Sequence, residues 1–103
     1  MNFNERKKAF RTTKVWKDFT KGLKAKRKVD ALTLAKLRKG STSHHLDLNP
    51  DHYEVLDEDL FETLNIKSHE VVHFMYNYYK KDPFIIDRLK AILHKMVLIN
   101  GDW

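Results

Sequence analysis

The chain of 103 residues contains no cysteine. This absence excludes a disulfide framework, a cysteine nucleophile and any zinc site with cysteine ligands. Long hydrophobic runs are also missing, since the longest unbroken apolar stretch is residues 96–99, far short of the roughly 20 residues that span a bilayer. Residues 1–8 carry charge but no apolar stretch, so we expect no secretory signal there. These absences predict a soluble, cytoplasmic protein with no membrane partner.

The composition favours a folded chain. Apolar residues make up 42% of the sequence and charged residues 33%, a balance typical of a globular body rather than a disordered one. A chain of this length can bury one modest core. We therefore expect one compact domain.

Charge is distributed unevenly along the chain. Residues 1–40 contain fourteen Lys and Arg against three acidic residues, a net charge of +11, whereas residues 41–103 have a net charge of −5. A strongly basic half favours a polyanionic partner, of which nucleic acid is the commonest. Plain solvated surface is the alternative explanation. The cations that we assign to nucleic-acid phosphates are Arg6, Lys7, Lys8, Arg11, Lys14, Lys24, Lys26, Arg27 and Lys28.

Hydrophobic spacing and turn residues predict an α+β fold in three parts. In the first part, Trp16 and Phe19 recur at helical spacing and predict one helix over 4–22, ended by Gly22. A charged connector follows at 24–28, and we expect its tip to be mobile. Both aromatic residues are expected to anchor the core, with stacking on bases as the alternative. The three parts are a basic helix and connector at 1–28, a central unit at 29–79 and a C-terminal helix at 80–103.

The central part combines strand and helix signals. A turn at 30–37 precedes a predicted strand at 42–45, and a second strand is predicted at 61–64. Ser68 is the expected N-cap of a helix over 69–79. The last helix is predicted to begin at Pro83 and to bury a stripe formed by Ile85, Leu89, Ile92 and Met96.

Four of the six histidines fall in two pairs. His44 and His45 are adjacent at the end of a predicted strand, so their side chains point to opposite faces. His69 and His73 are four residues apart on a predicted helix, so they can converge on one ion. Imidazole ligands suit zinc, nickel or manganese better than calcium. The spacing therefore indicates a site for a divalent metal, although an ordinary hydrogen-bonded histidine is the alternative at each position.

The segment from His69 to His73 also matches His-Glu-x-x-His, the signature of helical zinc proteases. In that signature the histidines bind zinc and the glutamate activates water. A third ligand would have to come from Asp82, Asp87 or His94. This interpretation gives no role to the first histidine pair or to the basic segment, so we treat it as the minor alternative.

Two segments carry a resemblance to a known family. They are residues 43–53, SHHLDLNPDHY, and residues 64–73, LNIKSHEVVH, with the turn DALT at 30–33 before them. Together they resemble the motif of HNH endonucleases, closest in style to small proteins encoded by bacteriophages. The resemblance covers about residues 29–78. It implies a ββα-metal unit that hydrolyses DNA, in the cytoplasm of the host cell if the chain is encoded by a phage.

The resemblance also implies roles for the histidines. His44 and His69 would bind one divalent metal ion, with Zn, Mg, Mn or Ni as candidates. His73 would be a third ligand or a contact to the scissile phosphate. His45 would be the general base that takes a proton from water. The implied products carry a 5′ phosphate and a 3′ hydroxyl.

HNH endonucleases carry an asparagine between the two histidines of their motif, and this chain has no asparagine at the matching position. The family position falls on Leu60 in this chain, and Asn65, closer to His69, is the catalytic candidate that remains. If the asparagine function is lost, the expectation becomes a scaffold that binds without cleaving. Such a protein would use its basic and acidic surfaces for a protein partner, for example as a phage inhibitor of a host system.

Overall fold

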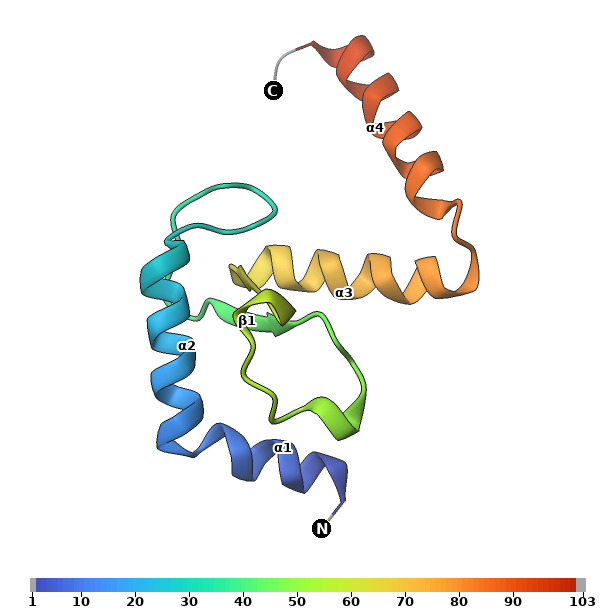
Figure 1. The fold of residues 1–103 in the computed structure, drawn as a ribbon. Helices are drawn as coiled ribbons and strands as arrows, with labels where there is room; N and C mark the ends of the chain where they lie inside the picture. The colour runs from blue at the N-terminus through green and yellow to red at the C-terminus, as the bar shows by residue number, and fades with distance from the viewer. Residues whose placement is uncertain (1, 102–103) are drawn as a thin grey trace. The chain divides into compact units, whose positions relative to one another are not determined.

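The structure is a computed structural model that describes residues 2–101 and belongs to the α+β class (Figure 1). In that range it contains four α-helices and one antiparallel sheet of two strands. The chain divides into two units, the first ending at His69 and the second beginning at Glu70. Among residues 2–101, no helix has the length and apolar character needed to cross a membrane.

Two helices stand where the sequence predicted one. α1 (Phe3–Arg11) and α2 (Lys14–Arg27) are separated at Thr12 and Thr13. The hydroxyl of Thr13 accepts a hydrogen bond from the backbone N–H of Trp16 and so caps the start of α2. The prediction of one helix over 4–22 is therefore wrong, because this threonine satisfies the backbone groups of a new helix start.

Helix α2 also continues past Gly22, so the predicted charged connector is mostly helical. Leu23 is 1% exposed and packs this last part of the helix into the core. Burial of a leucine contributes about 1.5–3 kcal/mol, which exceeds the cost of roughly 1 kcal/mol for a glycine within a helix. The helix ends at Lys28, whose φ of 68° is left-handed.

The turn predicted over 30–37 is confirmed. Val29 and Lys36 form an isolated antiparallel bridge, and the backbone N–H of Asp30 donates to the carbonyl of Ala35 over 2.8 Å. We call this segment, residues 29–37, the knuckle. It places the side chain of Asp30 at 0% exposure inside the first unit.

Both predicted strands are confirmed at the predicted residues. β1 (Thr42–His45) pairs with β2 (Phe61–Leu64) to form an antiparallel ribbon, in which Thr42 lies opposite Leu64 and His45 opposite Phe61. Three of the four residues of β2 are buried, which places this strand at the centre of the first unit.

The two faces of β1 have different neighbours. On one face the hydroxyls of Ser43 and Thr20 share a hydrogen bond, and the ring of His45 stacks on Trp16 of α2. Because side chains alternate along a strand, His44 points to the opposite face. The ribbon thus separates the two histidines of the first pair, as the sequence predicted.

The loop between the strands packs against α1. It contains two short 3₁₀ turns, η1 (Pro50–His52) and η2 (Glu58–Leu60). Tyr53 follows η1, is 6% exposed, and meets Phe3 and Phe10 edge to face at centroid separations of 5.5 and 5.8 Å. Helix α1 therefore fixes the part of the loop that carries Tyr53.

Helix α3 (Ile66–Lys81) begins three residues before its predicted start at His69. Ser68 therefore lies inside the first turn, 6% exposed, rather than at the N-cap. The reason is that Asp30 takes over the capping role, because its carboxylate accepts hydrogen bonds from the backbone N–H of Asn65 and from the side chain of Ser68.

Helix α4 (Ile85–Asn100) lies in the second unit, and none of its residues is buried. The predicted buried stripe is wrong there, since Ile92 is 58% exposed and Met96 is 40% exposed. Burial of a helical stripe needs another layer packed on it. The described part of the second unit consists of two helices joined by a short turn, which cannot enclose these side chains.

Candidate functional site

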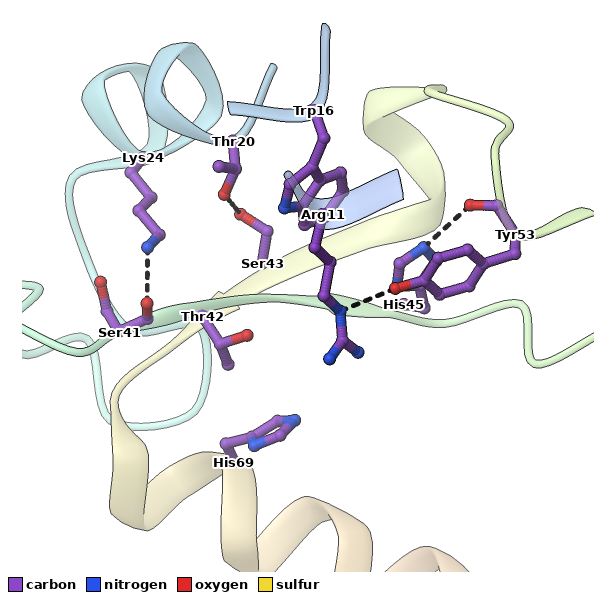
Figure 2. A pocket seen from close by; sticks show the side chains of 10 residues that line it. All are labelled: Arg11, Trp16, Thr20, Lys24, Ser41, Thr42, Ser43, His45, Tyr53 and His69. Atoms are coloured by element: carbon purple, nitrogen blue, oxygen red, sulfur yellow. Dashed lines mark hydrogen bonds between the residues drawn. The ribbon is translucent and has the colours of Figure 1, made fainter. Parts of the chain in front are cut away.

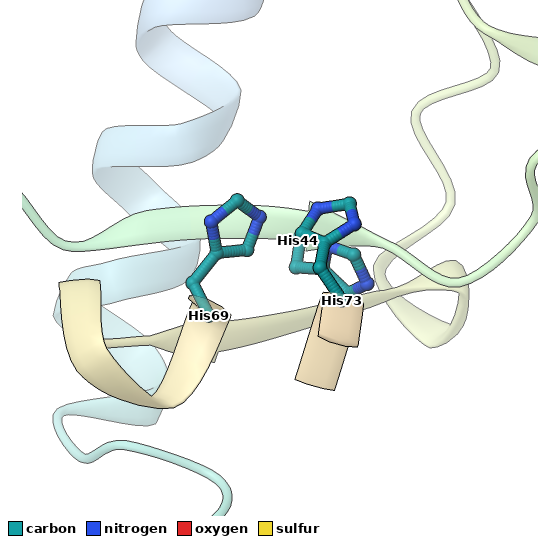
Figure 3. Close-up of side chains that lie close together, drawn as sticks. All are labelled: His44, His69 and His73. Carbon is teal, nitrogen blue, oxygen red and sulfur yellow. The ribbon is translucent and has the colours of Figure 1, made fainter. Parts of the chain in front are cut away.

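Strand β1 and the first turn of α3, both within the first unit, bring two of the predicted metal ligands together. His44 on β1 and His69 in the first turns of α3 have ring centroids 5.0 Å apart. His73 follows His69 by one turn of the same continuous helix, so helical geometry places the two on one face. One ring nitrogen from each of the three histidines lies within 4.8 Å of the others (Figure 3).

The chemistry of these donors fits a divalent ion that prefers nitrogen ligands. Three neutral imidazoles suit zinc or nickel, whereas magnesium, calcium and manganese prefer oxygen ligands. Around a tetrahedral zinc with bonds of about 2.0–2.1 Å, ligand nitrogens lie about 3.3–3.4 Å apart. The nitrogens here, up to 4.8 Å apart, would have to move closer together to bind such an ion. Three protein ligands would leave a fourth position open, which is the arrangement of catalytic rather than structural zinc sites.

The carboxylate of Asp30 fixes the start of the helix that carries His69. One oxygen accepts from the backbone N–H groups of Leu32 and Thr33, each at 2.8 Å, and the other accepts from Asn65 at 2.7 Å. Burial by itself would raise the pKa of Asp30, but these backbone bonds and the bond from Ser68 hold its pKa well below the usual range. Asp30 is therefore ionised and ties the knuckle to the first turn of α3.

His45 lies on the other face of β1, in an aromatic stack. Its ring is nearly parallel to those of Tyr53 and Trp16, with interplanar angles of 16° and 10°. Its Nε2 atom lies 3.2 Å from the backbone carbonyl of Tyr53 (Figure 2). A carbonyl only accepts hydrogen bonds, so Nε2 carries the proton and Nδ1 keeps the lone pair. The loop thus sets the tautomer of His45.

The surroundings of His45 favour its neutral form. Burial lowers its pKa, and the hydrogen bond to the Tyr53 carbonyl acts in the opposite direction. The positive charges of Arg11 and Lys7 lower the pKa further, while Asp47 raises it. The net effect is a pKa below the ordinary histidine value of about 6.5. A neutral imidazole is the form that can accept a proton.

A pocket of about 350 Å³ lies beside β1, and its lining includes both His45 and His69. Figure 2 shows Lys24 and Ser41 at one end of the pocket, with Arg11 and His45 towards the other and His69 below the strand. Its lining combines two cations, several hydroxyl groups and two imidazoles, which is the chemistry of an anion site. The full lining is Arg11, Trp16, Thr20, Lys24, Ser41, Thr42, Ser43, His45, Tyr53 and His69.

The guanidinium of Arg11 is held in place within this pocket. Its Nε atom donates to the hydroxyl of Tyr53 over 2.8 Å. Tyr53 therefore orients both Arg11, through its hydroxyl, and His45, through its backbone carbonyl. Arginine held in this way presents its remaining donors in a fixed plane, which suits phosphate oxygens.

The side chain of Asn65 lies in the scaffold of the site. Its amide oxygen accepts from the backbone N–H of Arg38 over 2.8 Å, and its amide nitrogen donates to the carbonyl of Lys36 over 3.1 Å. Both polar atoms therefore hold the end of the knuckle, one within it at Lys36 and one just after it at Arg38. In this structure Asn65 positions α3, and it is His45, not Asn65, that lines the pocket.

Much of the basic segment is engaged within the protein. Arg6 pairs with Glu54 at 2.8 Å, and Lys26 pairs with Glu58 at 2.7 Å. Arg27 donates to the backbone carbonyl of Glu58 over 3.0 Å and attaches α2 to the loop before β2. These cations hold the N-terminal helices on the ribbon, which is a structural use of their charge. Other assigned cations with partners in the protein are Lys14 with Asp18, Arg11 with Tyr53, and Lys24 with Ser41.

Two residues of the site were missed by the sequence interpretation. Tyr53 was assigned no role, because a backbone carbonyl carries no signal in the side-chain sequence. Asp30 was seen as part of a turn, yet its isolation from other acidic residues in a basic segment was a signal of a specific partner. Arg11 was assigned to nucleic-acid phosphates, and the structure places it in the lining of the pocket.

The zinc-protease alternative assigned the third ligand to a residue beyond His73. Here the histidine that joins His69 and His73 comes from β1, and it is His44. Asp82, one of the other candidates, instead accepts from Arg88 over 2.8 Å and from the backbone N–H of Phe84 over 3.0 Å.

Comparison with known proteins gives no match: no family model, curated protein or solved structure matches the chain. Functional conclusions therefore rest on the residues of the site and their geometry.

Proposed function

We propose that this chain is a metal-dependent endonuclease of the HNH type, in which β1, β2 and α3 form a ββα-metal unit that hydrolyses DNA. One observation carries the proposal. The adjacent histidines of β1 point to opposite faces of the strand. On one face, the ring centroids of His44 and His69 lie 5.0 Å apart. On the other, the bond to Tyr53 sets the tautomer of His45, which lines the same pocket as His69. A metal site and a proton acceptor are thereby brought together at one strand edge.

The residues of the chain support a hydrolytic mechanism. Nδ1 of His45 accepts a proton from water as the water attacks phosphorus, and the carbonyl of Tyr53 stabilises the imidazolium that results. The guanidinium of Arg11 offers its donors to the charge that develops on the phosphate oxygens. The bond between phosphorus and the 3′ oxygen breaks, and the leaving oxygen takes a proton from solvent water, so the products carry a 5′ phosphate and a 3′ hydroxyl.

A divalent ion held by His44, His69 and His73 would supply Lewis-acid polarisation of the phosphate and stabilisation of the leaving 3′ oxygen. The imidazole donors favour zinc or nickel for this position over magnesium or manganese.

DNA is the substrate that the charge distribution supports best. The first forty residues carry a net charge of +11, and Lys8 and Lys28 of this segment are exposed. Two more cations of this segment, Arg11 on α1 and Lys24 on α2, line the pocket itself. Phosphate contacts of this kind position a strand without reading its sequence, so we propose cleavage with little sequence preference.

The test is incubation of supercoiled plasmid with the pure protein and Mg²⁺, Mn²⁺, Ni²⁺ or Zn²⁺, with a chelator as control. We expect nicked or linear DNA with at least one of the nitrogen-preferring ions, and ends that a ligase can rejoin because they carry 5′ phosphates. Intact plasmid with every ion would contradict the enzyme proposal. DNA binding without cleavage would then favour the scaffold that binds only.

A further inference from the structure

Lys24 is a partly buried cation without an acidic partner. It lines the pocket from α2, and its Nζ atom donates to the backbone carbonyl of Ser41. Among residues 2–101 no carboxylate pairs with it, although burial lowers its pKa. An ammonium group has three donors, and a carbonyl uses one of them. A cation taken partly out of water in this way is stabilised by an anion.

The edge of β1 adds backbone donors to the same end of the pocket. Opposite Ser43 and His45, the residues of β2 turn their carbonyls away from β1: Thr63 accepts from Ala31, and Phe61 accepts from Arg27. Ser43 and His45 are therefore the non-hydrogen-bonded positions of the ribbon, and their N–H groups point away from β2. This free edge borders the pocket.

Hydroxyl groups complete the lining at this end. Ser41 lines the pocket beside Lys24, and Thr42, which is only partly exposed, lines it from the other face of β1, towards His69 (Figure 2). The volume of about 350 Å³ is that of a small-molecule site rather than of a single ion. The pocket thus has room for more than the one phosphate group that Arg11 would hold beside the proposed metal site.

We propose that Lys24, Thr42 and the backbone N–H of Ser43 form a second phosphate subsite, which binds the phosphate next to the one that is cleaved on the same DNA strand. This inference rests on the proposed function for its account of the first phosphate. The substrate would then be a polynucleotide strand with consecutive phosphates, rather than an isolated phosphodiester.

The test separates binding from cleavage. Metal-free protein in chelator is titrated with a fluorescein-labelled single-stranded DNA of twelve nucleotides. We expect Lys24→Gln to weaken binding about tenfold, as for the loss of a charged hydrogen bond. The matched control is Lys21→Gln, which removes the same charge from an exposed position of α2 and should change affinity less than twofold.

Two further measurements keep the inference testable if Lys24→Gln folds poorly. Thr42→Val keeps the β-branched shape suited to the strand and removes only the hydroxyl, so it should weaken DNA binding severalfold with unchanged thermal stability. In the wild type, the amide resonances of Ser43 should shift on titration with the same DNA. Equal affinities for wild type, Lys24→Gln and Thr42→Val would overturn the subsite.

Hydrolysis assays distinguish failure of the subsite from failure of the enzyme proposal. With metal, Lys24→Gln should slow cleavage of DNA more than it slows hydrolysis of bis(p-nitrophenyl) phosphate, which has one phosphate. DNA cleavage at the wild-type rate by this variant would refute the subsite alone. A protein that cleaves nothing but loses DNA affinity on Lys24→Gln would retain the subsite and refute the enzyme.

Discussion

His45 and Tyr53 are joined by a hydrogen bond of 3.2 Å from the imidazole Nε2 to a backbone carbonyl, while their rings stack with centroids 4.5 Å apart. One residue thus fixes both the plane and the tautomer of the histidine. Tyr53 is itself held by Arg11 through its hydroxyl and by aromatic contacts with α1. The N-terminal helices therefore organise the site as well as carrying charge.

Tyr53→Phe tests the orientation of Arg11. The change removes the acceptor of the Arg11 Nε bond but keeps the aromatic ring and the backbone carbonyl that holds His45. We expect DNA cleavage to fall about fivefold, equivalent to a hydrogen bond of about 1 kcal/mol, with metal affinity unchanged. In an Arg11→Gln background the same change should have no further effect. Additive losses in this double-mutant cycle would show that the hydroxyl acts elsewhere.

Metal affinity should depend on the strand and helix histidines together. We expect His44→Ala and His69→Ala each to weaken Zn²⁺ or Ni²⁺ binding, and the double variant to abolish it, because imidazole nitrogens supply the bonds to the ion. Calorimetry measures the affinity directly. His94→Ala, at an exposed position of α4, is the control and should bind as the wild type does. Unchanged affinity in the double variant would place the metal elsewhere.

Asp30→Asn should lower the free energy of unfolding by about 2–3 kcal/mol at neutral pH, since a buried carboxylate loses charged hydrogen bonds. The pKa of Asp30 is lower in the folded protein than its ordinary value of about 3.9. The contribution of ionised Asp30 to the free energy of unfolding is therefore fully present at pH values above its ordinary pKa, and it is lost as the pH falls below about 4.

Denaturant unfolding at several pH values checks this sign. The stability difference between wild type and Asp30→Asn should be constant from pH 5 to 7 and should shrink as the pH falls below about 4. Asp59→Asn, at an exposed position, is the control and should show no such difference. A gap that widens in acid would mean that Asp30 is protonated in the folded state.

Arg27 and Lys28 are neighbours with opposite expected roles. Arg27 donates to the backbone of Phe61 and Glu58, whereas Lys28 is exposed. We expect Arg27→Gln to destabilise the fold by about 1–2 kcal/mol and to leave the salt dependence of DNA binding unchanged. If Lys28 contacts a phosphate, Lys28→Gln should lower the log–log salt slope by about 0.9 without loss of stability. The reverse pattern would contradict these assignments.

The strands and the histidine cluster were predictable because local signals carried them. Alternation placed His44 and His45 on opposite faces, and the four-residue spacing of His69 and His73 placed both on one helical face. The start of α3 was not predictable from local signals, because its capping group is Asp30, a residue distant in sequence.

The helix break at Thr13 and the uses of the basic residues were harder to predict for the same reason. A threonine between two lysine-rich stretches can continue a helix or cap the start of a new one. The packing of Trp16 on Phe61 of the ribbon favours the cap at Thr13. The charge of Arg27 looked like solvent-facing charge until its backbone partners on β2 were known. Side chains that bond to distant backbone atoms leave no periodic pattern in the sequence.

The most direct measurement compares cleavage and metal binding in the same three proteins: wild type, His45→Ala and the His44→Ala/His69→Ala double variant. Single-turnover cleavage of plasmid is followed beside calorimetric metal affinity. We predict that His45→Ala binds metal as the wild type does but cleaves about 10²–10⁴-fold more slowly, as expected for loss of a general base, whereas the double variant loses both properties. Cleavage at the wild-type rate by either variant would contradict the proposed site.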